Sequence, residues 1–225
     1  MHDIPRFSAD EARRRTDGFH ELFYYRRLWD TTRWMGVQVY KCPFDLWIYQ
    51  EILFTERPSI VIECGTAQGG TALYLAHMYD LMGAEGGVVT IDIEPSGAAP
   101  QHPRITYVHG SSVDPGTFER VRAGLKPGDR PLVILDSLHN KDHVLAELRL
   151  WHSLVPAGGL MIVEDTNING HPVYTDFAPD QGPGAWEAVD AFLADHPEFE
   201  VDEAPERLLM TFNPRGYLRR RPAGA

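Results

Sequence analysis

The chain has 225 residues, of which 43% are hydrophobic and 24% charged, a composition typical of one globular α/β domain with a modest extension. Its 21 Lys and Arg against 32 Asp and Glu give a net charge of −11. So acidic a surface argues against nucleic acid as a partner, because binding phosphates needs a basic face. No apolar run approaches the roughly 20 residues that span a bilayer, so we expect no membrane partner.

The two cysteines, Cys42 and Cys64, cannot build a disulfide framework, and neither belongs to a Cys-x-x-Cys pair. The first residues also lack the apolar core of a secretion signal. We therefore expect a cytoplasmic protein.

Residues 1–58 are predicted to form a helical extension that precedes the first strand. Ser8 or Asp10 is a candidate N-cap for a first helix. A second helix is predicted over residues 45–54, with Asp45 as its N-cap. Such a layer commonly covers the sheet or the mouth of a substrate site.

From Ser59 onward, strands and helices alternate as in a doubly wound sheet, which defines a second region over residues 59–225. We predict a seven-stranded, mostly parallel sheet. Its strands are expected at 60–63, 86–92, 105–109, 131–136, 159–165, 199–201 and 208–212. Its helices are expected from the glycine loop to about residue 81, and at 118–123, 142–151 and 185–194.

Two stretches fall outside these elements. Thr166–Gly184 is rich in Asn, Gly, Pro and Asp and is longer than a simple connection, so we interpret it as a lid over the acceptor. The C-terminal arginines, Arg215 and Arg219 to Arg221, are interpreted as a solvated tail.

A glycine-rich loop joins the first strand to its helix in Ile60-Val-Ile-Glu63-Cys-Gly65-Thr-Ala-Gln-Gly69-Gly70. It does not match the dinucleotide pattern Gly-x-Gly-x-x-Gly, since a carboxylate stands at the strand end. A carboxylate would repel a pyrophosphate and attract an amino group, which favours the methionine moiety of S-adenosylmethionine. The loop resembles motif I of the class I methyltransferases, although an ordinary β–α turn is the alternative. The expected cofactor contacts here are Glu63, Gly65, Thr66, Gln68 and Gly69.

Further cofactor contacts are expected where later strands end, because ligands of such sheets bind at the carboxyl ends of the strands. Asp92 is placed to accept hydrogen bonds from ribose hydroxyls, and Ser111 and Ser112 are candidates for the adenine side. Asp136 closes the fourth strand beside them. For each of these residues, an ordinary role in a turn is the alternative.

Asp136, Glu164 and Asp165 place three carboxylates on neighbouring strand ends. Carboxylates repel each other unless a cation lies between them, and a hard oxygen site suits Mg²⁺. His139, three residues after Asp136, is the candidate general base. The alternative is that the carboxylates only cap turns. His143 is expected to be structural, and His171 is a candidate for acceptor contact.

With these residues in view, the chain resembles the cephalosporin hydroxylase-like and rhamnosyl O-methyltransferase family. The resemblance rests on residues 41–51, 63–71, 134–139, 164–167 and 212–218. It implies a Rossmann-like class I methyltransferase fold, S-adenosylmethionine, a Mg²⁺ site and homo-oligomers. The chain is also similar to macrolide and enediyne sugar O-methyltransferases. Carried over by position, this similarity makes Asp136, Glu164 and Asp165 metal ligands and His139, with Asp136, catalytic.

The sequence therefore predicts a Mg²⁺-dependent O-methyltransferase that acts on a hydroxyl of a small molecule, with a sugar of a secondary metabolite, as in antibiotic biosynthesis, as the favoured acceptor. One rival is a cephalosporin-type hydroxylation or methoxylation enzyme, for which two histidines and a carboxylate would be needed. Only His139 and His143 near Asp136 could supply them. A second rival is a non-catalytic S-adenosylmethionine-binding subunit.

Overall fold

The computed structural model describes residues 7–94, 96–173, 183–222 and 224. No helix within these ranges combines the length and apolarity needed to cross a bilayer. The elements follow in the order α1 (Ala9–Tyr25), the 3₁₀ turn η1 (Leu28–Thr31), β1 (Arg33–Trp34), β2 (Val37–Gln38), α2 (Pro43–Glu56), β3 (Ile60–Cys64), α3 (Gly70–Met82), β4 (Gly87–Asp92), β5 (Ile105–His109), α4 (Pro115–Gly124), β6 (Pro131–Leu135), α5 (Lys141–Trp151), η2 (His152–Leu154), β7 (Leu160–Val163), α6 (Ala185–Asp195), β8 (Phe199–Val201), η5 (Ala204–Leu208) and β9 (Tyr217–Arg220).

A seven-stranded sheet forms the centre of the fold, in the order β5-β4-β3-β6-β7-β9-β8. The strands from β5 to β7 pair in parallel, whereas β9 is antiparallel to both of its neighbours. The strand order reverses direction at β3, so the glycine loop after β3 lies at the point where ligands bind in such sheets. The predicted seven-stranded, mostly parallel sheet is confirmed.

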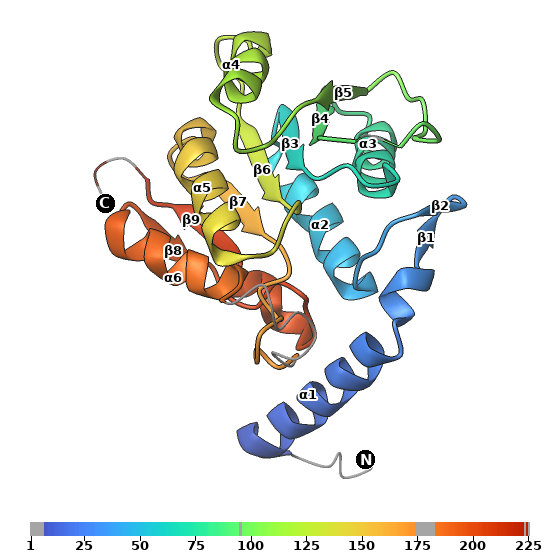
Figure 1. The fold of residues 1–225 in the computed structure, drawn as a ribbon, viewed down its shortest axis with the longest axis vertical. Helices are drawn as coiled ribbons and strands as arrows, with labels where there is room; N and C mark the ends of the chain where they lie inside the picture. Colours follow the sequence, from blue (N-terminus) through green and yellow to red (C-terminus); the bar gives the residue numbers. More distant parts are fainter. Residues whose placement is uncertain (1–6, 95, 174–182, 223, 225) are drawn as a thin grey trace.

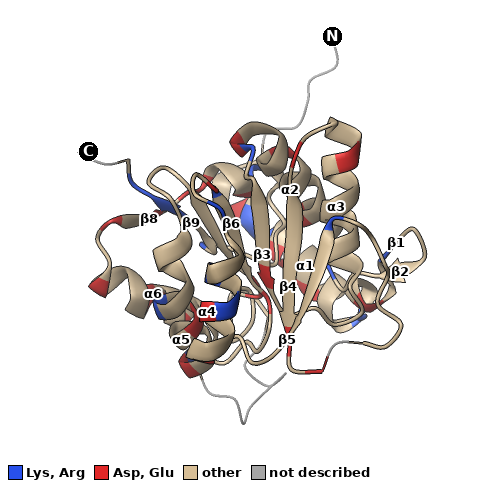
Figure 2. Ribbon diagram, turned by 90° about the horizontal axis from the view of Figure 1, so that it is seen from above, with Lys and Arg blue, Asp and Glu red and all other residues tan. Residues whose placement is uncertain are grey.

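Helices cover both faces of this sheet (Figures 1 and 2). One face buries apolar side chains against α4, α5 and α6, around the fully buried Trp151 and Phe192. The other face packs against α2 and α3, with Tyr49 and Tyr79 among its largest buried side chains. The predicted second helix, α2, is therefore a layer of the central fold. Burying this much apolar surface is the main stabilising contribution to both faces.

The first helix extends away from the sheet toward the N-terminus (Figure 1). The Ser8 side chain accepts a hydrogen bond from the backbone N–H of Glu11 at 3.2 Å, so Ser8 is the N-cap. At the other end of α1, His20 and Tyr24 are buried and their rings pack against Phe212. This contact ties the extension to the C-terminal part of the chain.

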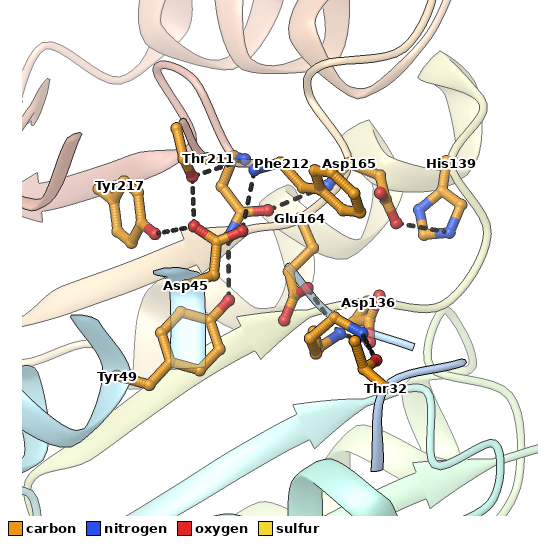
Figure 3. Close-up of polar contacts among 12 residues, drawn as sticks. Thr32, Asp45, Tyr49, Asp136, His139, Glu164, Asp165, Thr211, Phe212 and Tyr217 are labelled. Carbon is orange, nitrogen blue, oxygen red and sulfur yellow. Dashed lines mark hydrogen bonds and ion pairs between the residues drawn. The ribbon is translucent and has the colours of Figure 1, made fainter. Parts of the chain in front are cut away.

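The prediction that Asp45 caps the second helix is wrong. Helix α2 begins at Pro43, which is pre-organised for a first helical position, and Cys42 precedes it as N-cap. Asp45 is instead buried inside the first turn (Figure 3). Its carboxylate accepts hydrogen bonds from the Thr211 hydroxyl at 2.5 Å and the Phe212 backbone N–H at 2.8 Å.

The prediction of the last strand is also wrong. The predicted strand at 208–212 is the end of the 3₁₀ turn η5 and an irregular segment, and the seventh strand is β9. The segment bends because Thr211 and Phe212 donate to Asp45. The arginines are not a free tail: Arg219 lies within β9 and forms ion pairs with Glu56 and Asp202, both at 2.8 Å.

The predicted lid falls partly outside the described residues, which omit 174–182. Its first residues pack against the body, with Thr166 and Asn167 fully buried. The Thr166 hydroxyl donates to the Pro214 carbonyl at 2.7 Å, and Asn167 pairs with His20 at 2.8 Å. The acceptor-covering role of this loop stays a prediction.

Gly70, the first residue of α3, allows the N-terminal extension to approach the cofactor loop. A Cβ atom built there would overlap the backbone carbonyl of Gln38, a residue of β2. Because both groups belong to the backbone, no side-chain rotation relieves the clash. A Cβ built at Gly18, inside α1, would meet no described atom within 4 Å beyond its chain neighbours and the local helix backbone.

We predict that Gly70→Ala destabilises the protein by about 1–3 kcal/mol, as overpacking does. Gly18→Ala is the matched control and should be neutral or stabilising by about 0.5–1 kcal/mol, since Ala is the better helix former. Chemical denaturation measures both values. A Gly70→Ala protein as stable as the wild type would contradict the close approach.

Candidate functional site

The glycine loop between β3 and α3 shapes the centre of the site. Gly65 has a φ of +101°, and a Cβ there would overlap the backbone carbonyl of Asp136. Gly69 has a φ of +76° and precedes the first turn of α3. The loop therefore lies directly against the end of β6, with glycine required at its closest point.

Asp92, at the end of β4, holds this loop. Its Oδ2 accepts hydrogen bonds from the backbone N–H groups of Thr66 and Ala67, both at 3.0 Å. Its Oδ1 accepts from the Glu94 N–H at 2.9 Å. A carboxylate bonded to three backbone donors is fixed in position, so Asp92 presents a pre-organised acceptor at the rim.

Glu63 lies beneath the loop rather than on a cavity wall. Its side chain is buried, and its Oε2 has no hydrogen-bond partner among the described residues. Burial raises the pKa of Glu63 to about 8, although Thr90 and Lys41 oppose the shift. Direct contact between Glu63 and a cofactor stays a prediction. Gln68 is exposed and its Oε1 accepts from the Ser96 hydroxyl at 3.1 Å.

A cavity of about 350 Å³ opens on the β4 side of the loop. Asp92, Ser111, Ser112 and Asp136, all predicted cofactor contacts, line it, together with Gly65. Apolar walls come from Ile91, Ile93 and Leu138. The structure thus brings most of the predicted cofactor residues to one cavity.

His143, from α5, also lines this cavity. His143 Nε2 lies 3.0 Å from the Ser137 hydroxyl and 3.3 Å from the Ser112 hydroxyl. Ser137 also donates to Glu147 Oε1 at 2.6 Å, and Glu147 is fully buried. His143 is therefore part of a polar network that lines the cavity. It lies in the first turn of α5, where its backbone N–H donates to the N-cap Asn140 Oδ1 at 2.9 Å.

A second cavity, of about 280 Å³, adjoins the first and shares Gly65, Ala67, Asp136 and Ser137 with it. Its lining includes the charged and polar groups Lys41, Thr66, Gln68, Asp136, His139 and Asp165. It also includes an aromatic wall of Tyr24, Trp29, Tyr40 and Phe212, whose rings pack against one another. The N-terminal extension supplies most of that aromatic wall.

The predicted carboxylates are neighbours, as the strand order required. The backbone N–H of Asp136 donates to the Cys64 carbonyl at 2.8 Å, and that of Glu164 donates to the Leu135 carbonyl at 2.9 Å, so the pairing of β3, β6 and β7 continues to the rim. Asp165 adopts a left-handed φ of +54° and donates its N–H to Asn213. This turn sends the side chains of Glu164 and Asp165 in different directions (Figure 3).

Lys41 was not predicted and is the central cation of the site. Its side chain is only 4% exposed, and its ammonium lies between Asp136 Oδ2 and Glu164 Oε2, the latter at 2.6 Å. Burial alone would lower the pKa of Lys41, but Asp136 and Glu164 raise it above its ordinary value. Burial raises the pKa values of both carboxyl groups, and Lys41 opposes those shifts.

The carboxylates retain capacity for a second cation. Asp136, Glu164 and Asp165 carry three negative charges when ionised, and Lys41 offsets one of them. Glu164 Oε1 is buried without a hydrogen-bond partner among the described residues, and an orphaned buried carboxylate oxygen is costly. Asp136, His139 and Asp165 each offer one ligand atom within 4.8 Å of the others. This donor set fits a hard divalent cation such as Mg²⁺.

His139 follows β6 and is paired with Asp165. Its Nε2 lies 3.2 Å from Asp165 Oδ2, and its side chain is 30% exposed (Figure 3). Because the Asp165 carboxylate accepts a hydrogen bond from Nε2, the tautomer with its proton on Nε2 is favoured, and Nδ1 is left as the basic nitrogen. His171 lies elsewhere: it stacks on Trp186 and contacts Glu187 at 3.1 Å.

We predict that Lys41→Met destabilises the metal-free protein by about 3–5 kcal/mol at pH 8, because removing one partner leaves buried carboxylates uncompensated. The deficit should shrink as the pH falls, since Asp136 and Glu164 then take up protons. Lys126→Met, at an exposed position, is the control. Equal unfolding free energies for Lys41→Met and the control at pH 8 would contradict the role of Lys41.

Comparison with known proteins identifies the family of this chain. The family described as Rhamnosyl O-methyltransferase/CmcI matches residues 26–221. A rhamnosyl O-methyltransferase of Mycobacterium bovis BCG is 39% identical over 208 residues, which cover 89% of this chain and 82% of that protein. One of Mycobacterium leprae is 38% identical over 210 residues, covering 90% and 89%.

Solved structures share the fold. An apo-structure of CmcI has a TM-score of 0.65 at 21% identity and covers 99% of this chain and 88% of its own. A CmcI structure with Mg and SAM has the same TM-score at 19% identity, covering 98% and 88%. The sequence matches to the two mycobacterial relatives cover most of this chain and most of each relative. The chain therefore belongs to the Rhamnosyl O-methyltransferase/CmcI family and is an S-adenosylmethionine-dependent O-methyltransferase.

Proposed function

We propose that this protein transfers the methyl group of S-adenosylmethionine to a hydroxyl of a sugar-bearing small molecule, with Mg²⁺ bound at the rim carboxylates. The observation that carries the proposal is the pair of adjoining cavities that meet at Asp136. One has the residues expected of a nucleoside site, and the other combines an acidic cluster with an aromatic wall. Methyl transfer needs the donor and the acceptor in line across such a junction.

The cofactor would occupy the cavity on the β4 side. Asp92 is already fixed by backbone donors and would accept from ribose hydroxyls. The apolar Ile93 and Leu138 would flank the adenine ring, with Ser111 and Ser112 at its polar edge. The methionine end would then extend past Gly65 toward the second cavity, because Gly65 and Asp136 line both cavities.

The acceptor would occupy the cavity behind the loop. Sugar rings present C–H groups on their faces and hydroxyls at their edges. The aromatic wall of this cavity suits the C–H faces of a sugar ring, and the charged groups, which include His139 and Lys41, suit its hydroxyls. The rhamnosyl acceptor in the names of the mycobacterial relatives is consistent with this division.

Asp136 and Asp165 would hold the Mg²⁺. Glu164, whose Oε1 has no hydrogen-bond partner among the described residues, would be the third carboxylate ligand. A bound dication lowers the pKa of a nearby hydroxyl. His139 would take the hydroxyl proton at Nδ1, while Asp165 orients the ring through Nε2 and stabilises the imidazolium that forms. Lys41 would keep Asp136 and Glu164 in place throughout.

The hydroxylase alternative is not favoured, because its two-histidine triad is not assembled among the described residues near the rim. Only His139 joins Asp136 and Asp165 there. His143 lies instead in the network with Ser112, Ser137 and Glu147. Turnover by the purified chain alone would distinguish an enzyme from the second rival, a non-catalytic S-adenosylmethionine-binding subunit.

We also expect a homo-oligomer, because large apolar side chains are exposed on α1 and α2. Leu22 is 57% exposed and Trp47 is 61% exposed. Covering such side chains with a second copy would remove apolar surface from water. Light scattering in solution tests this assignment.

We predict that Asp92→Ala weakens S-adenosylmethionine binding by roughly 1–3 kcal/mol, because charge-assisted bonds to ribose are lost. Ser111→Ala, on the same cavity, is the matched control and should cost less, as its hydroxyl is uncharged. Calorimetric titration measures both affinities. Unchanged affinity in Asp92→Ala would remove Asp92 from the cofactor site.

We predict that His139→Ala lowers the methyl-transfer rate on the order of 10²- to 10⁴-fold, as expected on losing a general base, with cofactor affinity nearly unchanged. EDTA should abolish turnover of the wild type, and added Mg²⁺ should restore it.

The Mg²⁺ affinity of His139→Ala is the informative control, because His139 also lies among possible ligand atoms. An affinity equal to that of the wild type supports the base, whereas a parallel loss of metal and rate would make His139 a ligand. Full activity both in EDTA and without His139 would overturn the mechanism.

A further inference from the structure

A second group of metal-binding side chains lies at the opposite rim of the sheet. Parallel strands β6 and β7 are joined by α5, so the C-terminal end of α5 lies at the amino ends of the strands, away from the cofactor loop. His152 follows α5 directly, and His196 and Glu198 follow α6. Each of the three offers one ligand atom within 4.8 Å of the others. None takes part in the proposed methyl transfer.

The His152 ring is held in the orientation of a metal ligand. Its Nδ1 lies 3.1 Å from the backbone carbonyl of Leu148 and donates to it, so the lone pair is left on Nε2. Ligating histidines typically have such a second hydrogen bond, because it fixes the tautomer and the ring. The ring also packs edge-on against Phe192 and Phe199.

His196 and Glu198 are set side by side by a short turn through Pro197. The Phe199 N–H donates to the His196 carbonyl at 3.0 Å, which closes the turn. His196 stacks on Phe192 with ring centroids 4.3 Å apart, and its ring lies 4.4 Å from that of His152. Its Nδ1 lies 3.0 Å from Glu198 Oε1. A metal between these two atoms would take the place of the proton that they share.

The spacing is compatible with a tetrahedral centre. With Zn–N bonds of about 2.0–2.1 Å, tetrahedral ligand atoms lie roughly 3.3 Å apart, so the three groups need to close by at most about 1.5 Å. His196 Nδ1 and Glu198 Oε1, 3.0 Å apart, are already near that spacing, so the remaining approach is between His152 and this pair. The nearby cations are already engaged: Arg220 donates to the Val155 carbonyl at 2.7 Å, and Arg221 pairs with Glu200 at 2.9 Å.

We propose that His152, His196 and Glu198 form a binding site for a divalent transition metal, with Zn²⁺ as its best-suited occupant. Two imidazoles and one carboxylate are ligands that Zn²⁺ accepts, and they leave a fourth position for water. The bound ion links the end of α5 to the turn between α6 and β8. Because the unfolded chain lacks this arrangement, binding stabilises the fold.

Calorimetric titration with Zn²⁺ tests the site in the presence of millimolar Mg²⁺, in the His139→Ala background, so that the rim cluster competes less. We expect one Zn²⁺ per chain and a rise in melting temperature. His152→Ala and His196→Ala should each weaken binding by about 100-fold or more and remove that rise, and Glu198→Gln, the mildest change, should weaken it to a lesser degree. Co²⁺ should give a visible absorption spectrum that disappears in the same variants.

His102→Ala is the matched control, because His102 also lies near a second histidine, His77, and 3.0 Å from a carboxylate of Asp80. It should leave Zn²⁺ binding unchanged. With His139 intact, His152→Ala should retain wild-type methyl transfer, which separates this site from the proposed reaction. Equal Zn²⁺ affinity and stoichiometry in the His152 and His196 variants, or no binding at micromolar Zn²⁺, would overturn the proposal.

Discussion

The buried contact of Lys41 with Asp136 and Glu164 is the interaction on which the site depends. The carboxylates lie at one rim because they follow neighbouring parallel strands, whether or not a cation is present. Burial opposes the ionisation of each carboxyl group. The Lys41 ammonium, on a side chain that is 4% exposed, offsets one of these charges from inside the protein. What remains is an excess of negative charge, with Glu164 Oε1 buried and without a hydrogen-bond partner among the described residues. The same contact thus makes the cluster compatible with the fold and leaves the carboxylates that the proposed Mg²⁺ would use.

Lys41 can act there only because the N-terminal extension is held against the sheet by several independent contacts. The chain approaches α3 at Gly70, where no side chain is tolerated. Four residues after Lys41, buried Asp45 accepts hydrogen bonds from the segment that precedes β9. That segment also supplies Phe212 to the aromatic wall and to the packing of α1. Displacing the extension would therefore remove Lys41 and most of the aromatic wall together, so the region before β3 belongs to the proposed active site.

The parts of this structure that could be predicted are those encoded by local pattern. Apolar runs and turn residues placed β3 to β7 and their helices, and the acids at the strand ends became neighbours because parallel strands end at one rim. What could not be predicted depends on contacts between distant segments. Nothing in the sequence around Lys41 indicates that its side chain is buried. The apolar pattern of residues 208–212 predicts a strand, but in the structure Thr211 and Phe212 donate hydrogen bonds to the distant Asp45. The Ser112–His143 contact likewise joins the loop after β5 to helix α5, between residues that are 31 positions apart in the sequence.

The acidity of the rim also bears on the direction of the proposed reaction. The sulfonium of S-adenosylmethionine carries a positive charge that is lost when the methyl group leaves. Asp136 borders both cavities, and its carboxylate would stabilise the charged cofactor more than the neutral product. In the proposed reaction, the proton taken by His139 would lie beside Asp165, so the positive charge lost at the sulfur would be regained within the same cluster. Charge would therefore be redistributed along the rim, which would keep the electrostatic cost of the step low.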